Sequence, residues 1–247
     1  MLKYILLFLY FSTNLYSQSL IQQKKHPRVK NAYSLRYDSI QKLFKDNNLN
    51  FPPENLFLQA FKLNDTLELW AKNNNQKQYK LLRSYQICTR CGEVGPKRKE
   101  GDLQVPEGCY FINHLNPNSN FLLSLGINYP NASDRIHSDK NHPGNAIYIH
   151  GNCVSLGCLP LTDPIIQELY LICLENQLNF DTKIPVYIFP IRFNSFEYVQ
   201  LKIEPILNPK LIQFWQTLEP IYNYFLKQSQ LPNLILNKEG YYQINKS

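Results

Sequence analysis

The sequence predicts a mainly β protein with flanking helices, an α+β fold. Apolar and polar residues alternate on both sides of a turn at 64–66, and a third alternating segment follows at 79–87. Such alternation is typical of strands that bury one face. Apolar residues also recur at helical spacing before this region and near the C-terminus. A chain of 247 residues with 44% hydrophobic content is long enough to bury one large core.

The N-terminus has the layout of a secretory signal peptide. In MLKYILLFLYFSTNLYS, Lys3 precedes an apolar run from Tyr4 to Phe11, and small and polar residues follow. The run is shorter than the ~20 apolar residues that span a bilayer. We expect cleavage near Ser17–Gln18, which removes residues 1–17. The mature protein is then periplasmic or secreted, without stable insertion in a membrane.

The rest of the chain divides into three expected regions. Residues 18–54 are polar and basic, and one short helix is expected at 34–44. A β-rich domain at 55–193 follows. Residues 194–247 are expected to form a helical extension, because LIQFWQTLEPIYNYFL places apolar residues at helical spacing. Pro220 within that pattern is expected to kink or break the helix.

The β-rich domain is expected to open with the antiparallel hairpin and the third strand already described. Further strands are expected at 108–113, 120–125, 146–150 and 183–193. The segment 126–145 is rich in Gly, Pro, Asn and Asp, so we expect a long loop without regular structure there. Thr162 or Asp163 is expected to cap a helix that starts with Pro164.

Basic residues outnumber acidic ones by 26 to 19, which gives a net charge of +7. A surplus of this kind can indicate a nucleic acid partner. Here the basic residues are scattered, apart from KKHPRVK near the start of the mature chain and PKRK at 96–99. We therefore expect a solvated basic surface, no nucleic acid partner, and contact with the anionic polymers of the cell envelope that export makes accessible.

Six cysteines occur, at positions 88, 91, 109, 153, 158 and 173. In an exported protein an even number suggests disulfides, although one working thiol would leave an odd number for pairing. The pair in CTRC at 88–91 is expected to form a local disulfide or to stay as two plain thiols. Cys109 and Cys173 fall on a predicted strand and helix, where cysteine packs as a small hydrophobe. The redox state of the cysteines other than Cys158 stays open.

The stretch AIYIHGNCVSLGCLPLTDP places His150, Cys153 and Cys158 within nine residues. This spacing allows a metal site, a disulfide or a nucleophilic thiol. A free thiol has a pKa of about 8.5 and needs a nearby base to attack a carbonyl. A loop with glycines at 151 and 157 can fold Cys158 back beside His150. Gly157 also leaves room for the backbone N–H groups of residues 157 and 158 to bind an oxyanion.

A zinc site is the main alternative outside acyl transfer. Cys153 and Cys158 could share a metal with a nearby histidine, but their separations match none of the common paired ligand spacings. No metal or other cofactor is therefore expected. His137 and His142 are expected to be solvated rather than catalytic. Arg135, on the same long loop, is a candidate for binding a substrate carboxylate, because a guanidinium can bind it through two parallel hydrogen bonds.

HGNCVSLGC resembles the active-site signature of the YkuD-type L,D-transpeptidase family, in which a histidine–glycine pair is followed by a Ser-x-Gly-Cys segment. It is most similar to the YafK-like branch, where the two parts lie eight residues apart and a Thr-Asp pair follows, here Thr162-Asp163. Further similar segments are EGDLQVPEGCYFI, LNPNSNFLLSLGINYPNASDR, FPIRF and FWQTLEPIYNYF. The resemblance therefore covers about Asn55 to Phe225.

The resemblance implies a fold and a role for each matching residue. Members of the family fold as a β-sandwich-like catalytic domain. By this resemblance Cys158 is the nucleophile, and His150 is the general base and acid. Ser155 and Gly157 are expected to shape the oxyanion hole, and Gly151 completes the histidine–glycine pair beside the substrate.

The same resemblance implies an exported cysteine acyltransferase that acts on peptidoglycan stem peptides. Cys158 would form a thioester on the third stem residue, from which an amine gives a crosslink and water gives hydrolysis. An amidase that trims stems or releases wall-linked proteins would use the same residues. Leu156 stands where many members have a second histidine, which leaves acceptor binding open. A wall-binding module without catalysis is a further alternative, and Cys153 keeps structural and redox roles open.

Overall fold

The computed structural model describes residues 20–89, 91–180, 182–203 and 208–245, so the predicted signal peptide lies outside the described residues. The strands are β1 (Asn55–Phe61), β2 (Thr66–Lys72), β3 (Lys80–Gln86), β4 (Gly108–Asn116), β5 (Ser124–Ile127), β6 (Tyr148–His150), β7 (Leu159–Pro160), β8 (Pro185–Phe189), β9 (Leu234–Leu236) and β10 (Tyr242–Ile244). The helices are α2 (Pro27–Asp46), the 3-10 helix η1 (Lys62–Asn64), α3 (Ala132–His137), α4 (Asp163–Asn179), α5 (Phe196–Ile203) and α6 (Pro209–Gln228).

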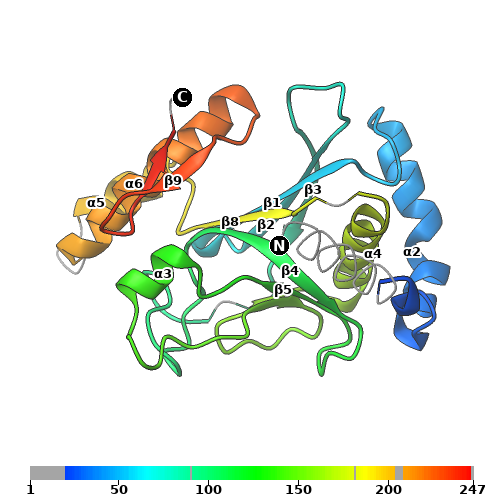
Figure 1. Cartoon of the computed structure of the whole chain (residues 1–247), viewed down its shortest axis with the longest axis horizontal. Coiled ribbons are helices and arrows are strands. Elements are labelled where there is room, and N and C mark those ends of the chain that lie inside the picture. Colours follow the sequence, from blue (N-terminus) through cyan, green and yellow to red (C-terminus); the bar gives the residue numbers. More distant parts are fainter. Residues whose placement is uncertain (1–19, 90, 181, 204–207, 246–247) are drawn as a thin grey trace, which may run out of the picture.

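In the described part of the chain, eight strands form one mixed sheet in the order β3-β2-β1-β8-β4-β5-β6-β7 (Figure 1). Neighbouring strands run antiparallel except in the pairs β1–β8 and β6–β7, which are parallel. Strands β9 and β10 pair with each other in a separate two-stranded sheet. The predicted α+β class, mainly β with flanking helices, is confirmed.

The first three strands lie where the alternating pattern predicts them. β1 and β2 form the predicted hairpin, with Phe61 opposite Thr66 at its closed end. Asp65, in the turn, has a φ of 46°, a left-handed conformation that aspartate tolerates better than most residues. The hairpin prediction and the third strand, β3, are therefore confirmed.

Two hydrophobic cores lie on opposite faces of the sheet. In the first core α2 and α4 pack together, with Ile40 and Phe44 fully buried. In the second core α6 packs Tyr222 and Phe225 against aromatic side chains of β1 and β8. Figure 1 shows α2 and α4 at one side of the molecule and α5 and α6 at the other. Strand β1 contributes Leu58 to the first core and Phe57 to the second, because successive side chains of a strand point to opposite faces.

Two helices extend further than the sequence predicts. The helix expected at 34–44 is longer in the structure, where α2 runs from Pro27 to Asp46. It starts earlier because Pro27 suits the first turn and the His26 side chain accepts the Arg28 N–H at the N-cap. α6 continues through Pro220, so the predicted break does not occur, and the alternative of a kink stays a prediction. Its buried side chains on both sides of the proline pack in the second core, and we infer that this packing offsets the hydrogen bond that proline cannot donate.

Two further segments differ from the prediction. The expected irregular loop at 126–145 contains the helix α3, where Asn131 and Asp134 form a reciprocal capping box. The C-terminal extension at 194–247 is not wholly helical, because it also contains β9 and β10. Across the described ranges, no helix combines the length and the apolar character needed to cross a membrane.

A buried ion pair joins three parts of the fold. Lys62 Nζ lies 2.9 Å from Glu107 Oε1, and both side chains are shielded from solvent. Lys62 Nζ also donates to the backbone oxygens of Gly95 at 2.6 Å and Val105 at 3.0 Å. Trp215 Nε1 donates to the other oxygen of Glu107 at 2.7 Å. The pair therefore ties η1, the irregular segment before β4 and the helix α6 together.

Removing one partner of this ion pair is expected to destabilise the fold. In Lys62→Met the Glu107 carboxylate stays buried without its counter-charge, and we expect a loss of about 3–5 kcal/mol in the free energy of unfolding, measured by urea titration. Lys42→Met removes an exposed pair with Asp46 and serves as the control. We expect a change within about 1 kcal/mol there. Equal stabilities of the two variants would contradict the importance of the buried pair.

Candidate functional site

Strand β6 ends at His150, which is buried, with 1% of its surface exposed. Its ring stacks on Phe121 with a centroid distance of 4.4 Å and an interplanar angle of 24°. His150 Nδ1 lies 2.6 Å from the backbone oxygen of Gly151. Because a carbonyl oxygen can only accept, Nδ1 carries the hydrogen, and Nε2 of the neutral ring is left as a proton acceptor.

Cys158 lies immediately before β7, beside the strand that carries His150. The parallel pairing of β6 and β7 aligns His150 with Pro160. Cys158, two residues earlier, therefore stands beside Tyr148, and Tyr148 points to the same face of β6 as His150. No hydrogen bond joins the thiol to the imidazole in the described structure. In enzymes without bound substrate, catalytic hydrogen bonds are often long or poorly aligned and form only when the substrate binds.

Burial favours the uncharged form of both groups. It lowers the pKa of His150 below its usual 6.5, and a backbone carbonyl partly opposes this. Burial raises the pKa of the Cys158 thiol above that of a free thiol, and Cys91 raises it further. A backbone hydrogen bond from Tyr148 and the charge of Lys97 act in the opposite direction. The resting pair is therefore a thiol and a neutral imidazole, rather than a thiolate and an imidazolium.

Ser155 holds the backbone of the segment before β7. Its Oγ accepts hydrogen bonds from the N–H groups of Gly157 at 3.1 Å and Cys158 at 2.9 Å, and donates to the Cys158 carbonyl oxygen at 2.9 Å. This hydroxyl is thus hydrogen-bonded to the two N–H groups that are expected to form an oxyanion hole. Gly157 has a φ of +115°, and a Cβ there would lie 2.8 Å from the backbone oxygen of Gln104, so this position requires glycine.

A disulfide links the loop between His150 and Cys158 to the end of β3. Cys88 is bonded to Cys153, at a sequence separation of 65 residues. Both expectations for CTRC are therefore wrong, because Cys88 pairs outside this motif and Cys91 is a free thiol. Thr89 Oγ1 also donates to the carbonyl oxygen of Cys153 at 3.0 Å. The middle of the loop is thus anchored covalently and by a hydrogen bond.

Lys97 is a buried cation close enough to lower the pKa of the thiol, although sequence analysis places it on a solvated surface. Its Nζ lies 2.7 Å from Asp102 Oδ1 and donates to the Lys99 carbonyl oxygen at 2.9 Å. These partners offset the cost of burying the charge. The sequence feature that could have indicated a buried Lys97 is its partner Asp102, which lies in the EGDLQVPEGCYFI segment of the family resemblance.

Arg135 is not brought together with the other candidate residues. It is exposed on α3. A hydrogen bond of 2.7 Å from Ser133 Oγ to the Gly240 carbonyl oxygen joins α3 to the C-terminal hairpin, which consists of β9 and β10. Among the described residues, no interaction joins Arg135 to His150 or Cys158. Its predicted contact with a substrate carboxylate stays a prediction.

The remaining histidines and cysteines have structural surroundings. The His137 ring packs against Tyr241 at a centroid distance of 4.7 Å, so the prediction of a solvated side chain is wrong there. His142 is exposed, as predicted. Burial raises the pKa values of the Cys109 and Cys173 thiols, in keeping with packing as small hydrophobes. Within the described ranges, no three His, Cys, Asp or Glu side chains are grouped so that they could hold a metal ion.

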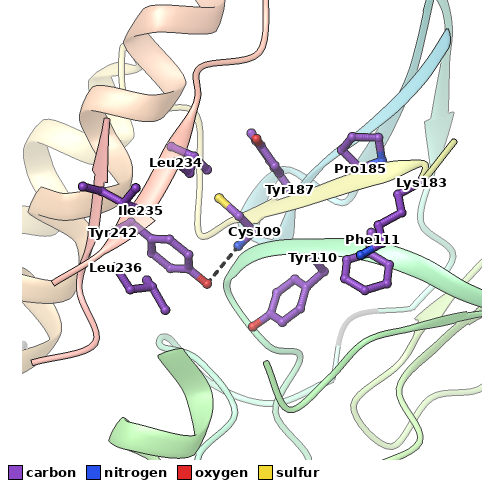
Figure 2. A pocket seen from close by; sticks show the side chains of 10 residues that line it. All are labelled: Cys109, Tyr110, Phe111, Lys183, Pro185, Tyr187, Leu234, Ile235, Leu236 and Tyr242. Carbon is purple, nitrogen blue, oxygen red and sulfur yellow. Dashed lines mark hydrogen bonds between the residues drawn. The ribbon is translucent and has the colours of Figure 1, made fainter. Parts of the chain in front are cut away.

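Two cavities differ in their relation to the thiol. A small cavity of about 10 Å³ lies beside Cys158 and has room for about one water molecule, so a peptide does not bind in it. A larger cavity of about 310 Å³ lies between β4, β8 and the C-terminal hairpin (Figure 2). It is lined by Cys109, Tyr110, Phe111, Lys183, Pro185, Tyr187, Leu234, Ile235, Leu236 and Tyr242. This larger cavity is therefore separate from the candidate site.

Comparison with known proteins identifies similar sequences. Residues 60–188 match the family model described as the L,D-transpeptidase catalytic domain. The chain is 34% identical over 209 residues to the protein named "Putative L,D-transpeptidase YafK" of Escherichia coli K12, and the match covers 84% of this chain and 79% of that protein. The protein of the same name from Escherichia coli O157:H7 matches to the same extent.

Solved structures give weaker matches. The helical cell shape determining protein Pgp2 of Campylobacter jejuni is 16% identical, with a TM-score of 0.44, over 74% of this chain and 73% of that chain. Bd1075 of Bdellovibrio bacteriovorus is 21% identical, with a TM-score of 0.40, over 57% of this chain and 50% of that chain. This chain thus spans about half the length of Bd1075.

Loss of the disulfide is expected to loosen the loop that precedes Cys158. We expect Cys153→Ser to lower the free energy of unfolding by about 2–4 kcal/mol, because the bond closes a long loop of the unfolded chain. The same variant is expected to increase the rate at which iodoacetamide alkylates Cys158, followed by peptide mass spectrometry. Cys91→Ser, which removes a free thiol, is the control. Alkylation of Cys88 in the folded wild-type protein would show that the bond is absent.

Proposed function

Because the chain belongs to the L,D-transpeptidase catalytic domain family, whose members modify peptidoglycan, we propose that it is an exported cysteine acyltransferase acting on peptidoglycan stem peptides. The observation that best supports this proposal is the state of His150. Its Nδ1 is engaged by the Gly151 carbonyl, which leaves Nε2 as the acceptor on the strand beside Cys158. A histidine held in one tautomer beside a thiol is suited to general base catalysis.

In the proposed mechanism, His150 Nε2 takes the thiol proton while Cys158 Sγ attacks. The attacked carbonyl is on the L-centre of the third stem residue, a diamino acid. The new bond between sulfur and the carbonyl carbon gives a tetrahedral intermediate with a negatively charged oxygen. The N–H groups of Gly157 and Cys158 bind this oxygen after the Ser155 hydroxyl has moved away from them. His150 then returns the proton to the leaving amine, and a thioester on Cys158 remains.

The fate of the thioester depends on the acceptor. An amine forms a new crosslink, whereas water completes a hydrolysis, and a site that excludes water favours the amine. Leu156 is 78% exposed and offers an apolar side chain where many family members have a histidine. Because leucine cannot make the polar contact of that histidine, acceptor binding stays open, and an amidase that trims stems or releases wall-linked proteins is the second candidate function.

The proposed setting is the periplasm or the outside of the cell, with residues 1–17 as the signal peptide. A net charge of +7 suits contact with anionic wall polymers. We assign the activity to residues 55–193, with 18–54 and 194–247 as flanking regions. Arg135 is proposed to bind a stem carboxylate at a distance from the catalytic segment, on the exposed surface of α3.

Cys158→Ala is expected to abolish both crosslinking and hydrolysis while changing the free energy of unfolding by less than about 1 kcal/mol. The assay incubates the protein with defined tetrapeptide muropeptides, with and without an added amine, and identifies the products by mass. Products that carry the amine indicate a transpeptidase, and shortened stems alone indicate an amidase. Cys91→Ala is the matched control, since it removes the neighbouring free thiol. Full turnover by Cys158→Ala would overturn the mechanism.

The dependence of kcat/KM on pH is expected to report a neutral His150. The base must be unprotonated, and its pKa is lowered from 6.5, so activity is expected to fall only as the pH drops through that lowered pKa. The Cys158 pKa lies above 9.0, so activity is not expected to fall between pH 7 and 9. A reactive thiolate–imidazolium pair would instead lose activity when the imidazolium deprotonates. A decline between pH 7 and 9 would therefore contradict the neutral pair.

A further inference from the structure

The peptide group between Gly151 and Asn152 has a hydrogen-bond partner on each side. Its carbonyl oxygen, which belongs to Gly151, lies 2.6 Å from His150 Nδ1. Its N–H, which belongs to Asn152, donates to Asp163 Oδ1 at 2.9 Å. A carboxylate, one peptide group and the imidazole thus form a continuous chain of hydrogen bonds.

We propose that Asp163 is a positioning residue for His150 and acts through this peptide group. This role rests on the proposed function, in which His150 is the base. A carboxylate that accepts the peptide N–H polarises the peptide and makes its carbonyl oxygen more negative. The more negative oxygen holds the Nδ1–H of His150 more firmly. It also stabilises the imidazolium that forms when Nε2 takes the thiol proton.

The backbone at Gly151 leaves space for this carboxylate. A Cβ on Gly151 would lie 2.7 Å from Asp163 Oδ1 and 2.8 Å from the backbone oxygen of Phe121, closer than a real side chain allows. The Gly151 N–H donates to the same Phe121 oxygen at 3.1 Å. The glycine of the histidine–glycine pair is therefore needed for Asp163 to approach the peptide that faces His150.

Asp163 reaches His150 through the peptide rather than through a direct charge interaction. Burial and the Gly151 carbonyl are the causes of the lowered His150 pKa, and no charged side chain of the described residues contributes. Asp163 is itself exposed, in the first turn of α4, so water screens its direct field. The hydrogen bond to the Asn152 N–H is not screened in this way, because donor and acceptor are in contact.

The test separates the charge of Asp163 from its shape. Asp163→Asn keeps an acceptor oxygen and removes the charge, and Asp163→Ser is a second variant with a neutral acceptor. We expect the His150 pKa, measured by NMR titration of the imidazole, to fall by about half a unit. Acylation by tetrapeptide muropeptides is expected to slow about threefold to tenfold, since a charge-assisted hydrogen bond is replaced by a neutral one.

Glu168→Gln is the control, because it removes another carboxylate from α4, one that accepts from Tyr85. We expect it to leave the His150 pKa unchanged. An unchanged His150 pKa in both Asp163 variants would overturn the proposal, even if their melting temperatures fall, because a stabilising helix terminus alone does not alter the basicity of His150. If the wild-type protein does not acylate but the pKa still shifts, the proposed function fails and the positioning role stands.

Discussion

The buried ion pair between Lys62 and Glu107 is the constraint on which the rest of the structure depends. The segment before β4 has little regular structure, and Lys62 holds it through two backbone oxygens as well as through Glu107. Trp215 donates to the same carboxylate, so the second core and this segment meet at one point. Lys62 and Val105 also line the small cavity beside Cys158. The packing that stabilises the sheet therefore also forms one wall of the small cavity beside the thiol.

Burial shifts the pKa values of His150 and Cys158 in opposite directions. The pKa of His150 falls and that of Cys158 rises, so separated charges are unfavourable before a substrate is bound. A protonated thiol is a poor nucleophile and needs a base whose acceptor nitrogen is held in place. The bond from His150 to Gly151 provides that orientation. The disulfide at Cys153 restrains the loop that separates the pair, which limits how far the thiol can move from the ring.

The sequence predicted best the elements whose signal is local. The hairpin of β1 and β2 and the start of α4 depend on neighbouring residues, and both lie where the pattern places them. The Gly, Pro, Asn and Asp content of 126–145 predicted a loop where α3 forms. Asn131 followed three residues later by Asp134 is nevertheless a signature of a helix start. The break that was one of the two outcomes predicted at Pro220 does not occur in α6, because a proline's local cost says nothing of the packing that surrounds it.

By itself the sequence determined the mixture of strands and helices, the family resemblance, and the close spacing of His150 and Cys158, because these depend on residue type and on separation along the chain. Only the tertiary structure decided that Cys88 pairs with Cys153, that Lys97 is buried, and that Asp163 reaches the peptide beside His150. Each of these contacts joins segments that come together only on folding, or depends on the exclusion of water from a packed interior. A pattern along one chain records neither distance in space nor the loss of solvent.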